Sequence, residues 1–314
     1  MKLSFVIPCY NEEDNVELIH DKISETFKKV KYDYELIFVN DGSKDKTIIN
    51  LRKLVKKSKQ NIKVVDFSKN FGKEAAIYAG LKESTGELVS LIDADMQQDP
   101  KYVLEMVEFL DANEEYDSVA MYQDKRREGK VLSFFKKSFY KLINKISDTK
   151  FTSNASDFRT LRRNMVDAIL SVKEYYRFSK GIFSWVGFNT YYMPYQVLDR
   201  ANGTTKWSFK KLFKYALDGI ISFTTAPLKM ATYVGLFSSF CSIVYLIVVI
   251  IQKLCFGIDI PGYATIITLI LFLGGLQLFS LGIIGEYIAR TYIEVKERPI
   301  YIAREVISNR SKKW

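Results

Sequence analysis

The sequence predicts an α/β protein: a mostly parallel, Rossmann-like sheet with helices on both faces, followed by amphipathic helices at a membrane surface and two membrane-spanning helices. Three observations support this prediction. Short β-rich runs alternate with helical patterns through residues 1–120, the section 121–230 is strongly basic, and two long charge-free segments follow it. Continuous apolar strands separated by helices are typical of a parallel sheet that is covered on both sides.

The first 120 residues contain four apolar runs that end at turn or cap signals and are therefore expected to be strands. These runs are residues 3–7, 35–39, 62–67 and 87–92. Helical patterns occupy residues 11–29, 44–57 and 72–83, and Asn11 is expected to cap the first of these helices. Ligands bind beyond the carboxyl ends of the strands in such sheets, so we expect functional residues there.

Two segments are long and apolar enough to cross a membrane. No charged residue occurs between Lys229 and Lys253 or between Asp259 and Glu286, and a spanning helix needs about 20 mostly apolar residues. Two buried core helices are the alternative, but little chain remains to cover them. Basic residues follow Gly285, and the start of the chain lacks the pattern of a signal peptide. We therefore expect a multi-pass protein of the cell membrane, with its N-terminal domain and both termini in the cytoplasm.

The formal net charge of +10 is unevenly distributed along the chain. Residues 1–120 have a net charge of −6, residues 121–230 of +13 and residues 231–314 of +3. Two amphipathic stretches of the basic section, residues 130–145 and 206–221, combine lysines with aromatic side chains and are expected to lie on an anionic membrane surface. Packing against the domain core is the alternative. A nucleic-acid partner is not expected, because no recognition motif is present and the first section is acidic.

Polar residues follow three of the expected strands, at residues 8–12, 40–43 and 93–97. The carboxyl ends of parallel strands meet at one edge of a sheet, so these residues should lie close together. A lone aspartate after a strand is usually a turn or cap residue. Asp93, Asp95 and Gln97, however, offer two carboxylates and an amide oxygen to one hard cation. No glycine-rich phosphate loop follows the first strand, so the phosphates of a nucleotide would be held mainly through the metal.

The same residues resemble the inverting glycosyltransferase family 2, which has the GT-A fold. The matching motifs are Val-Ile-Pro-Cys-Tyr-Asn-Glu at residues 6–12, Val-Asn-Asp-Gly-Ser at 39–43 and Asp-Ala-Asp-Met-Gln at 93–97. Four further motifs, at residues 70–76, 157–159, 184–188 and 285–290, resemble the polyprenyl-phosphate branch of the family. This branch includes enzymes similar to bactoprenol glucosyltransferases and dolichol-phosphate mannose synthases. With the two spans, the resemblance covers nearly the whole chain.

The resemblance implies an inverting, metal-dependent transfer of a sugar from a UDP-sugar to undecaprenyl phosphate at the cytoplasmic membrane face. Glucose and N-acetylglucosamine are the expected sugars, and the product would be a polyprenyl-monophosphate sugar for cell-envelope glycosylation. The implied domains are a nucleotide-sugar-binding core at residues 1–125 and an acceptor-side part with membrane-interface helices at 126–229. Two transmembrane helices at 230–287 and a cytoplasmic tail at 288–314 would follow.

The resemblance also implies roles for single residues. Five residues are expected to bind the nucleotide: Pro8, Tyr10, Glu12, Asp41 and Asp93. Asp93, Asp95 and Gln97 would hold Mg²⁺ or Mn²⁺ against the diphosphate. Asp95 and Asp157 are the expected catalytic residues, and Asp157 matches a family position that acts as a base or orients a substrate.

Two motifs depart from the family pattern. The family often has an aspartate or histidine and then two prolines after the glutamine, whereas this chain has Gln98, Asp99 and Pro100. Near the membrane, the run Asn-Gly-Thr-Thr-Lys-Trp at residues 202–207 stands in place of Gly-Glu-Ser-Lys-Tyr, so the acidic residue is lost. Metal binding is expected to persist, while sugar or acceptor contacts near the membrane are expected to differ.

The acceptor phosphate needs positive charge rather than a strong base. The second pKa of a phosphate monoester is about 6, so the acceptor is largely ionised at neutral pH. Arginine can grip a phosphate through two hydrogen bonds. The expected phosphate ligands are Arg126, Arg127, Lys130, Arg200 and Lys206. The expected partners are a nucleotide sugar, undecaprenyl phosphate and anionic membrane lipids, and the chain is compatible with a homo-oligomer.

Two other functions are weighed against this one. A polysaccharide synthase of the same family is disfavoured, because the chain lacks a Gln-x-x-Arg-Trp motif and two spans make a poor polymer channel. A catalytically silent membrane scaffold or accessory protein with a nucleotide-binding fold is the alternative from another class. A silent domain would have no need of the metal site and the acidic residues named above, so an enzyme is expected.

Overall fold

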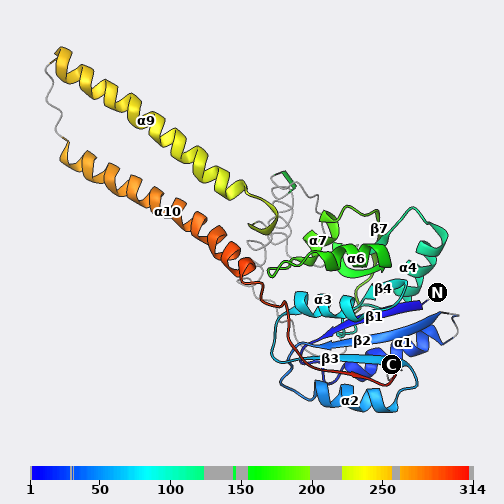
Figure 1. Cartoon of the computed structure of the whole chain (residues 1–314). Helices are drawn as coiled ribbons and strands as arrows, with labels where there is room; N and C mark the ends of the chain where they lie inside the picture. Colours follow the sequence, from blue (N-terminus) through cyan, green and yellow to red (C-terminus); the bar gives the residue numbers. More distant parts are fainter. Residues whose placement is uncertain are drawn as a thin grey trace.

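The computed structural model describes residues 2–28, 30, 32–123, 144–145, 155–198, 221–256 and 262–310. Within these residues, eight strands form one sheet in the order β7-β5-β6-β4-β1-β2-β3-β8 (Figure 1). The strands are β1 (Lys2–Cys9), β2 (Asp33–Asn40), β3 (Asn61–Phe67), β4 (Leu88–Leu91), β5 (Ser118–Gln123), β6 (Ala155–Arg162), β7 (Thr190–Tyr195) and β8 (Ala303–Ser308). The pairs β1–β2, β1–β4, β2–β3 and β5–β7 are parallel, whereas β6 and β8 run antiparallel to their neighbours. The predicted mostly parallel sheet is confirmed.

Helices cover both faces of this sheet. They are α1 (Val16–Phe27), α2 (Thr47–Lys57), α3 (Lys73–Glu83), α4 (Lys101–Ala112), α6 (Arg163–Ser171) and α7 (Ser179–Trp185). Phe5 of β1 is buried in one cluster with Ile19 of α1, while its neighbour Val6 is buried in a second cluster with Ala76 of α3. Successive side chains of a strand point to opposite faces, so the apolar run of β1 contributes to both cores. This explains why the central strands are apolar throughout rather than alternating.

The first helix begins at Val16, and the prediction that Asn11 caps it is wrong. Asn11 has a φ of 53°, in the left-handed region, and its Oδ1 accepts a hydrogen bond from the amide of Lys44 at 2.9 Å. Asn15 occupies the N-cap position instead. Asparagine is common both at helix caps and in tight turns, because its short side chain bonds to nearby backbone groups. The residue type alone therefore did not locate the start of the helix.

The segment after the second long helix returns to the sheet. β8 pairs antiparallel with β3 and forms one edge of the sheet. Asn309, just after β8, fixes this edge, because its Oδ1 accepts from the amide of Ile62 at 3.0 Å and its Nδ2 donates to the carbonyl of Gln60 at 2.6 Å. The sequence predicted only a tail here. In the structure, both ends of the chain contribute strands to the same sheet.

Two long helices, α9 (Ala226–Phe256) and α10 (Tyr263–Val295), extend away from the sheet as a hairpin (Figure 1). Their apolar parts, Ala226–Gln252 and Thr265–Val295, are 27 and 31 residues long, and each exceeds the roughly 20 residues that a membrane span needs. No residue in the most apolar window of either helix is buried. A core helix of a soluble protein would be covered, so these helices are candidate membrane spans and the protein is membrane-associated.

The end of α10 is fastened to the segment just before α9 and, through Glu294, to the sheet domain. The hydroxyl of Tyr287 donates to the carbonyl of Thr224 at 2.8 Å, and Arg290 donates to Ser222 Oγ at 2.9 Å. The amide of Tyr175 donates to Glu294 Oε1 at 2.8 Å. These bonds set how the hairpin leaves the domain. The predicted interface helices at 130–145 and 206–221 lie outside the described residues, except for residues 144–145 and 221.

Candidate active site

The ends of β1 and β2 are locked together by side-chain bonds to backbone amides. The amide of Asn11 donates to Ser43 Oγ and the amide of Glu12 donates to Thr47 Oγ1, each at 2.9 Å. The amide of Asp41 donates to the carbonyl of Cys9, also at 2.9 Å. Two of the predicted polar clusters, at residues 8–12 and 40–43, therefore form one continuous edge, as expected for neighbouring parallel strands.

Asp41 holds the loop that precedes α3. Its Oδ1 accepts from the amide of Phe71 at 2.7 Å, and its Oδ2 accepts from the amide of Gly72 at 3.0 Å. The residue is only 3% exposed. Burial raises the pKa of Asp41 to about 6, although the two amides act in the opposite direction. Next to it, Gly42 has a φ of +61°, and a Cβ there would lie 2.3 Å from the carbonyl carbon of Lys69. The turn after β2 thus requires glycine.

The turn after β4 carries the predicted metal ligands. Asp95 Oδ1 accepts from the amide of Gln97 at 3.2 Å, and Met96 between them has a φ of 64°. Gln98 clamps Asp93 from both sides: its Oε1 accepts from the Asp93 amide at 2.8 Å and its Nε2 donates to Asp93 Oδ2 at 3.0 Å. Gln98 therefore orients the Asp93 carboxylate. The departure from the family pattern at this position has a structural role in this chain.

Lys73, the first residue of α3, joins this turn to β6. Its ammonium lies 2.7 Å from Asp93 Oδ1 and 3.3 Å from Asp157 Oδ2. The structure thus brings Asp93 and Asp157 to a shared cation, although they lie far apart in the sequence. Burial alone would raise the pKa of Asp157, but Lys73, Lys180 and Arg159 lower it to about 2. Asp157 is therefore a carboxylate that stays ionised at neutral pH.

The surroundings of Asp157 are built from α7 and the start of α3. Arg159 is buried, and its guanidinium lies 3.8 Å from the ring centre of Phe183 in α7. Burial lowers the pKa of Arg159 to about 10, which leaves it charged at neutral pH. The amide of Ser179, which begins α7, donates to Glu74 Oε2 at 2.9 Å. The residue after Lys73 therefore anchors α7, the helix that carries Lys180 and Phe183.

The donor atoms in the turn after β4 fit a cation that is shared with a substrate. No cluster of three or more histidine, cysteine, aspartate or glutamate side chains suited to a metal occurs among the residues with described positions. Magnesium is usually bound by one or two carboxylates together with substrate phosphates and water. Asp93 and Asp95, with the amide oxygen of Gln97, supply that smaller set from a single turn. The chemistry of this set suits Mg²⁺ or Mn²⁺ bound together with a phosphate ligand.

The residues that hold the site together in the structure are not all residues that the sequence predicted. Lys73, Gln98 and Arg159 were not predicted, although Lys73 and Arg159 lie in motifs that carried the resemblance. Pro8, Tyr10 and Glu12 lie at the end of β1, and Glu12 Oε2 accepts from Asn15 Nδ2 at 2.7 Å. The five expected phosphate ligands all lie outside the described residues: Arg126, Arg127, Lys130, Arg200 and Lys206.

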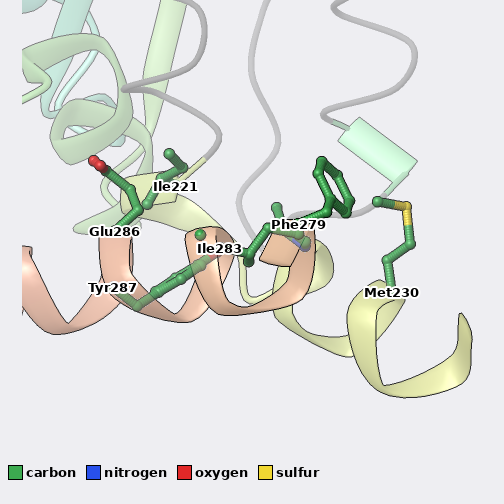
Figure 2. Close-up of a pocket in the computed structure, with 8 residues that line it drawn as sticks. Ile221, Met230, Phe279, Ile283, Glu286 and Tyr287 are labelled. Carbon is green, nitrogen blue, oxygen red and sulfur yellow. The ribbon is translucent and has the colours of Figure 1, made fainter. Parts of the chain in front are cut away.

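An apolar pocket of about 410 Å³ lies between the start of α9 and the later part of α10. Figure 2 shows Met230 of α9 near Phe279 of α10, with Ile283, Glu286 and Tyr287 further along α10. Glu286 forms an ion pair with Arg290 at 3.1 Å. Apart from this carboxylate, the labelled side chains offer mainly apolar surface next to the place where the hairpin joins the sheet domain.

The mostly parallel sheet and the acidic residues at its strand ends define an α/β domain of the GT-A class. Residues 4–170 match the family model described as glycosyl transferase family 2, and residues 226–291 match the model described as GtrB C-terminal hairpin. The first match covers more than half of the chain. The protein therefore belongs to glycosyltransferase family 2, and it is a glycosyltransferase.

Known proteins resemble this chain over nearly its full length. The Bacillus subtilis (strain 168) protein CsbB is 45% identical, with 96% of this chain and 91% of that protein covered. The bactoprenol glucosyl transferase of Shigella phage SfII is 40% identical, with 97% and 98% covered. Among solved structures, the glucosyl-3-phosphoglycerate synthase of Mycobacterium tuberculosis with Mn²⁺, UDP and glucosyl-3-phosphoglycerate has a TM-score of 0.46 and 19% identity, covering 70% of this chain and 77% of that one.

Proposed function

We propose that this glycosyltransferase moves a sugar, glucose or N-acetylglucosamine, from a UDP-sugar to undecaprenyl phosphate at the cytoplasmic face of the membrane, with inversion at the anomeric carbon. The observation that carries the proposal is the convergence of Asp93 and Asp157 on Lys73 in a domain fastened to a two-helix apolar hairpin. The phage relative named as a bactoprenol glucosyl transferase supports a polyprenyl phosphate as acceptor.

The donor side of the site is assigned to the ends of β1, β2 and β4. Pro8, Tyr10, Glu12 and Asp41 line the base and ribose, and Asp41 shapes their pocket through the loop that it holds. Asp93, Asp95 and Gln97 hold Mg²⁺ or Mn²⁺. When bound, this cation offsets the negative charge that develops on the leaving diphosphate.

Asp157 acts by orientation rather than as a base. A phosphate oxygen of the acceptor attacks the anomeric carbon, the bond from that carbon to the diphosphate breaks, and UDP leaves with the electron pair. The acceptor phosphate, whose second pKa is about 6, has no proton that must be removed. A carboxylate with a pKa of about 2 is a weak base. Its fixed charge instead positions the cations around it.

The membrane side of the proposal rests on charge and on apolar surface. Basic residues after Gly285 favour a cytoplasmic location of the sheet domain, with both spans crossing the membrane. The apolar pocket between α9 and α10 offers a surface for the isoprenoid chain close to the sheet domain (Figure 2). Arg126, Arg127, Lys130, Arg200 and Lys206 are the proposed phosphate ligands, and the anionic lipids of the surface are proposed to attract the basic section.

The test is a transfer assay with the full chain in detergent, undecaprenyl phosphate, Mg²⁺ or Mn²⁺ and a panel of labelled nucleotide sugars. We expect one UDP-sugar to give a lipid-linked product and metal-dependent UDP release. Asp95→Ala should abolish both, while Asp99→Ala, a matched change in the same turn, should keep most of the activity. Full turnover in Asp95→Ala would refute the metal site. The absence of a lipid-linked product with every sugar would refute the function.

A further inference from the structure

The ammonium of Lys73 occupies one carboxylate oxygen of Asp93, a proposed metal ligand. The ammonium lies 2.7 Å from Asp93 Oδ1, while Asp93 Oδ2 accepts from Gln98 Nε2 at 3.0 Å. Both oxygens of the proposed metal ligand therefore already have proton donors. Gln98 is neutral and leaves a lone pair of Oδ2 available. The ammonium is a full positive charge on the other oxygen, so it is the contact that conflicts with a bound cation.

The backbone of Lys73 is fixed while its side chain has room to move. The amides of Phe71 and Gly72 are held by Asp41, and Glu74 is tied to Ser179. The side chain of Lys73 itself is 42% exposed, and lysine has a long, flexible stem. Its second contact, to Asp157 Oδ2, is the longer one at 3.3 Å. The ammonium can therefore leave Asp93 without any change in α3.

We propose that Lys73 is an exchangeable counter-ion that competes with the divalent cation for Asp93 and that, once displaced, contacts the diphosphate of the donor while it remains paired with Asp157. The proposal rests on the function proposed above. It assigns Lys73 as a catalytic residue, because the displaced ammonium would touch the leaving group. The charge is the same in both positions, but its partner changes from a carboxylate to a phosphate.

The proposal makes the binding of metal and nucleotide interdependent. A divalent cation that binds alone must separate Lys73 from Asp93 without giving it a new partner. When the nucleotide is also present, the displaced ammonium gains a phosphate contact, and charge-assisted bonds to phosphate are strong. Each ligand should therefore increase the affinity for the other, and such coupling is reciprocal. Because Asp157 remains a partner of Lys73, filling of the donor side also changes the electrostatics around Asp157.

The test measures binding rather than turnover, with Mn²⁺ alone and with UDP at saturating Mn²⁺ as probes, on the full chain in detergent. In Lys73→Met we expect Mn²⁺ alone to bind about 3- to 10-fold more tightly, because its competitor is gone. UDP should bind about 10-fold more weakly, because its phosphate loses a cation. The matched control is Lys82→Met, an exposed lysine of the same helix, and both affinities should stay within about 2-fold of the wild type.

The two shifts have opposite signs, and a general loss of structure would not produce that result. Lys73→Gln should show the same pair of shifts, and Lys73→Arg should restore UDP affinity to within a few-fold. Mn²⁺ binding that is unchanged or weaker in Lys73→Met and Lys73→Gln would overturn the competition. UDP affinity that is unchanged in both would overturn the phosphate contact. Failure of the underlying metal site would look different, since Asp95→Ala would then bind Mn²⁺ as the wild type does.

Discussion

Two aspartates at the same edge of the sheet, Asp41 buried and Asp157 partly buried, have opposite electrostatic environments. Asp41 accepts hydrogen bonds from the amides of Phe71 and Gly72, and burial raises its pKa to about 6. Asp157 faces Lys73, Lys180 and Arg159, and despite its burial its pKa is about 2. Backbone amides offset the loss of solvent around a carboxylate less completely than full positive charges do. The comparison separates an aspartate suited to holding a loop from one suited to remaining charged among phosphates.

The largest effect on activity should come from neutralising Asp157. Asp157→Asn keeps the shape of the side chain but removes the charge that balances three cations, and misplacement of catalytic groups typically costs about 100-fold or more in rate. We expect turnover to fall by that factor, measured as lipid-linked product per minute. Asp167→Asn, a change at an exposed carboxylate of the neighbouring helix α6, is the control. Activity of Asp157→Asn close to that of the control would remove Asp157 from the reaction.

A change at Gly42, next to Asp41 in the turn after β2, should lower the stability of the domain. In Gly42→Ala the new Cβ would lie 2.3 Å from the carbonyl carbon of Lys69 and would force φ of +61° on an alanine. Overpacking and left-handed strain together cost about 3 kcal/mol or more. For a domain of this size, we expect a melting temperature about 10 °C lower.

Gly187→Ala is the matched control for this effect. Its φ of +76° is also left-handed, but a Cβ there would meet nothing within 4 Å. It should cost only the conformational term of about 1–2 kcal/mol. Equal losses of stability in the two variants would show that the turn after β2 is not tightly packed against the loop at Lys69.

The sequence predicted which residues lie at the carboxyl ends of the strands better than it predicted which residues they contact. Strands β1 to β4 are found close to the predicted runs because buried parallel strands are apolar on both faces. The placement of Asp93 and Asp157 around Lys73 could not be predicted, because it depends on the antiparallel pairing of β4 with β6. β8 was missed since it is not a continuous apolar run: it lies at the sheet edge, with alternate residues exposed. The expected phosphate ligands remain predictions.

The pH dependence of stability should have opposite signs for the two aspartates. Folding raises the pKa of Asp41 from 3.8 to about 6, so the folded state binds the proton more tightly and stability should fall as the pH rises from about 4 to 6. Folding lowers the pKa of Asp157 from 3.8 to about 2, so its contribution is present above about pH 4 and should be lost as the pH falls towards 2. Each effect is limited to roughly 2–3 kcal/mol.

Melting curves across this pH range test the signs. Asp41→Asn should remove the loss of stability between about pH 4 and 6 and leave the acid limb in place. Asp157→Asn should remove the loss of stability below about pH 4 and leave the loss between about pH 4 and 6 in place. If Asp41→Asn left the change in melting temperature between pH 4 and 6 unaltered, another group would be responsible for that change. The proposed difference between Asp41 and Asp157 would then be wrong for Asp41.

The smallest effect should come from a single distant cation of the Asp157 cluster. Lys73 forms an ion pair with Asp157 at 3.3 Å, whereas Lys180 lowers the pKa of Asp157 through its charge alone. Lys180→Met should raise the pKa of Asp157 by less than about one unit and lower the melting temperature at pH 7 by about 1–3 °C, with a smaller loss as the pH falls towards 2. Lys173→Met, at an exposed position six residues from the start of α7, should shift neither value. A loss at pH 7 as large as that of Asp157→Asn would mean that Lys180, rather than Lys73, supplies most of the charge that keeps Asp157 ionised.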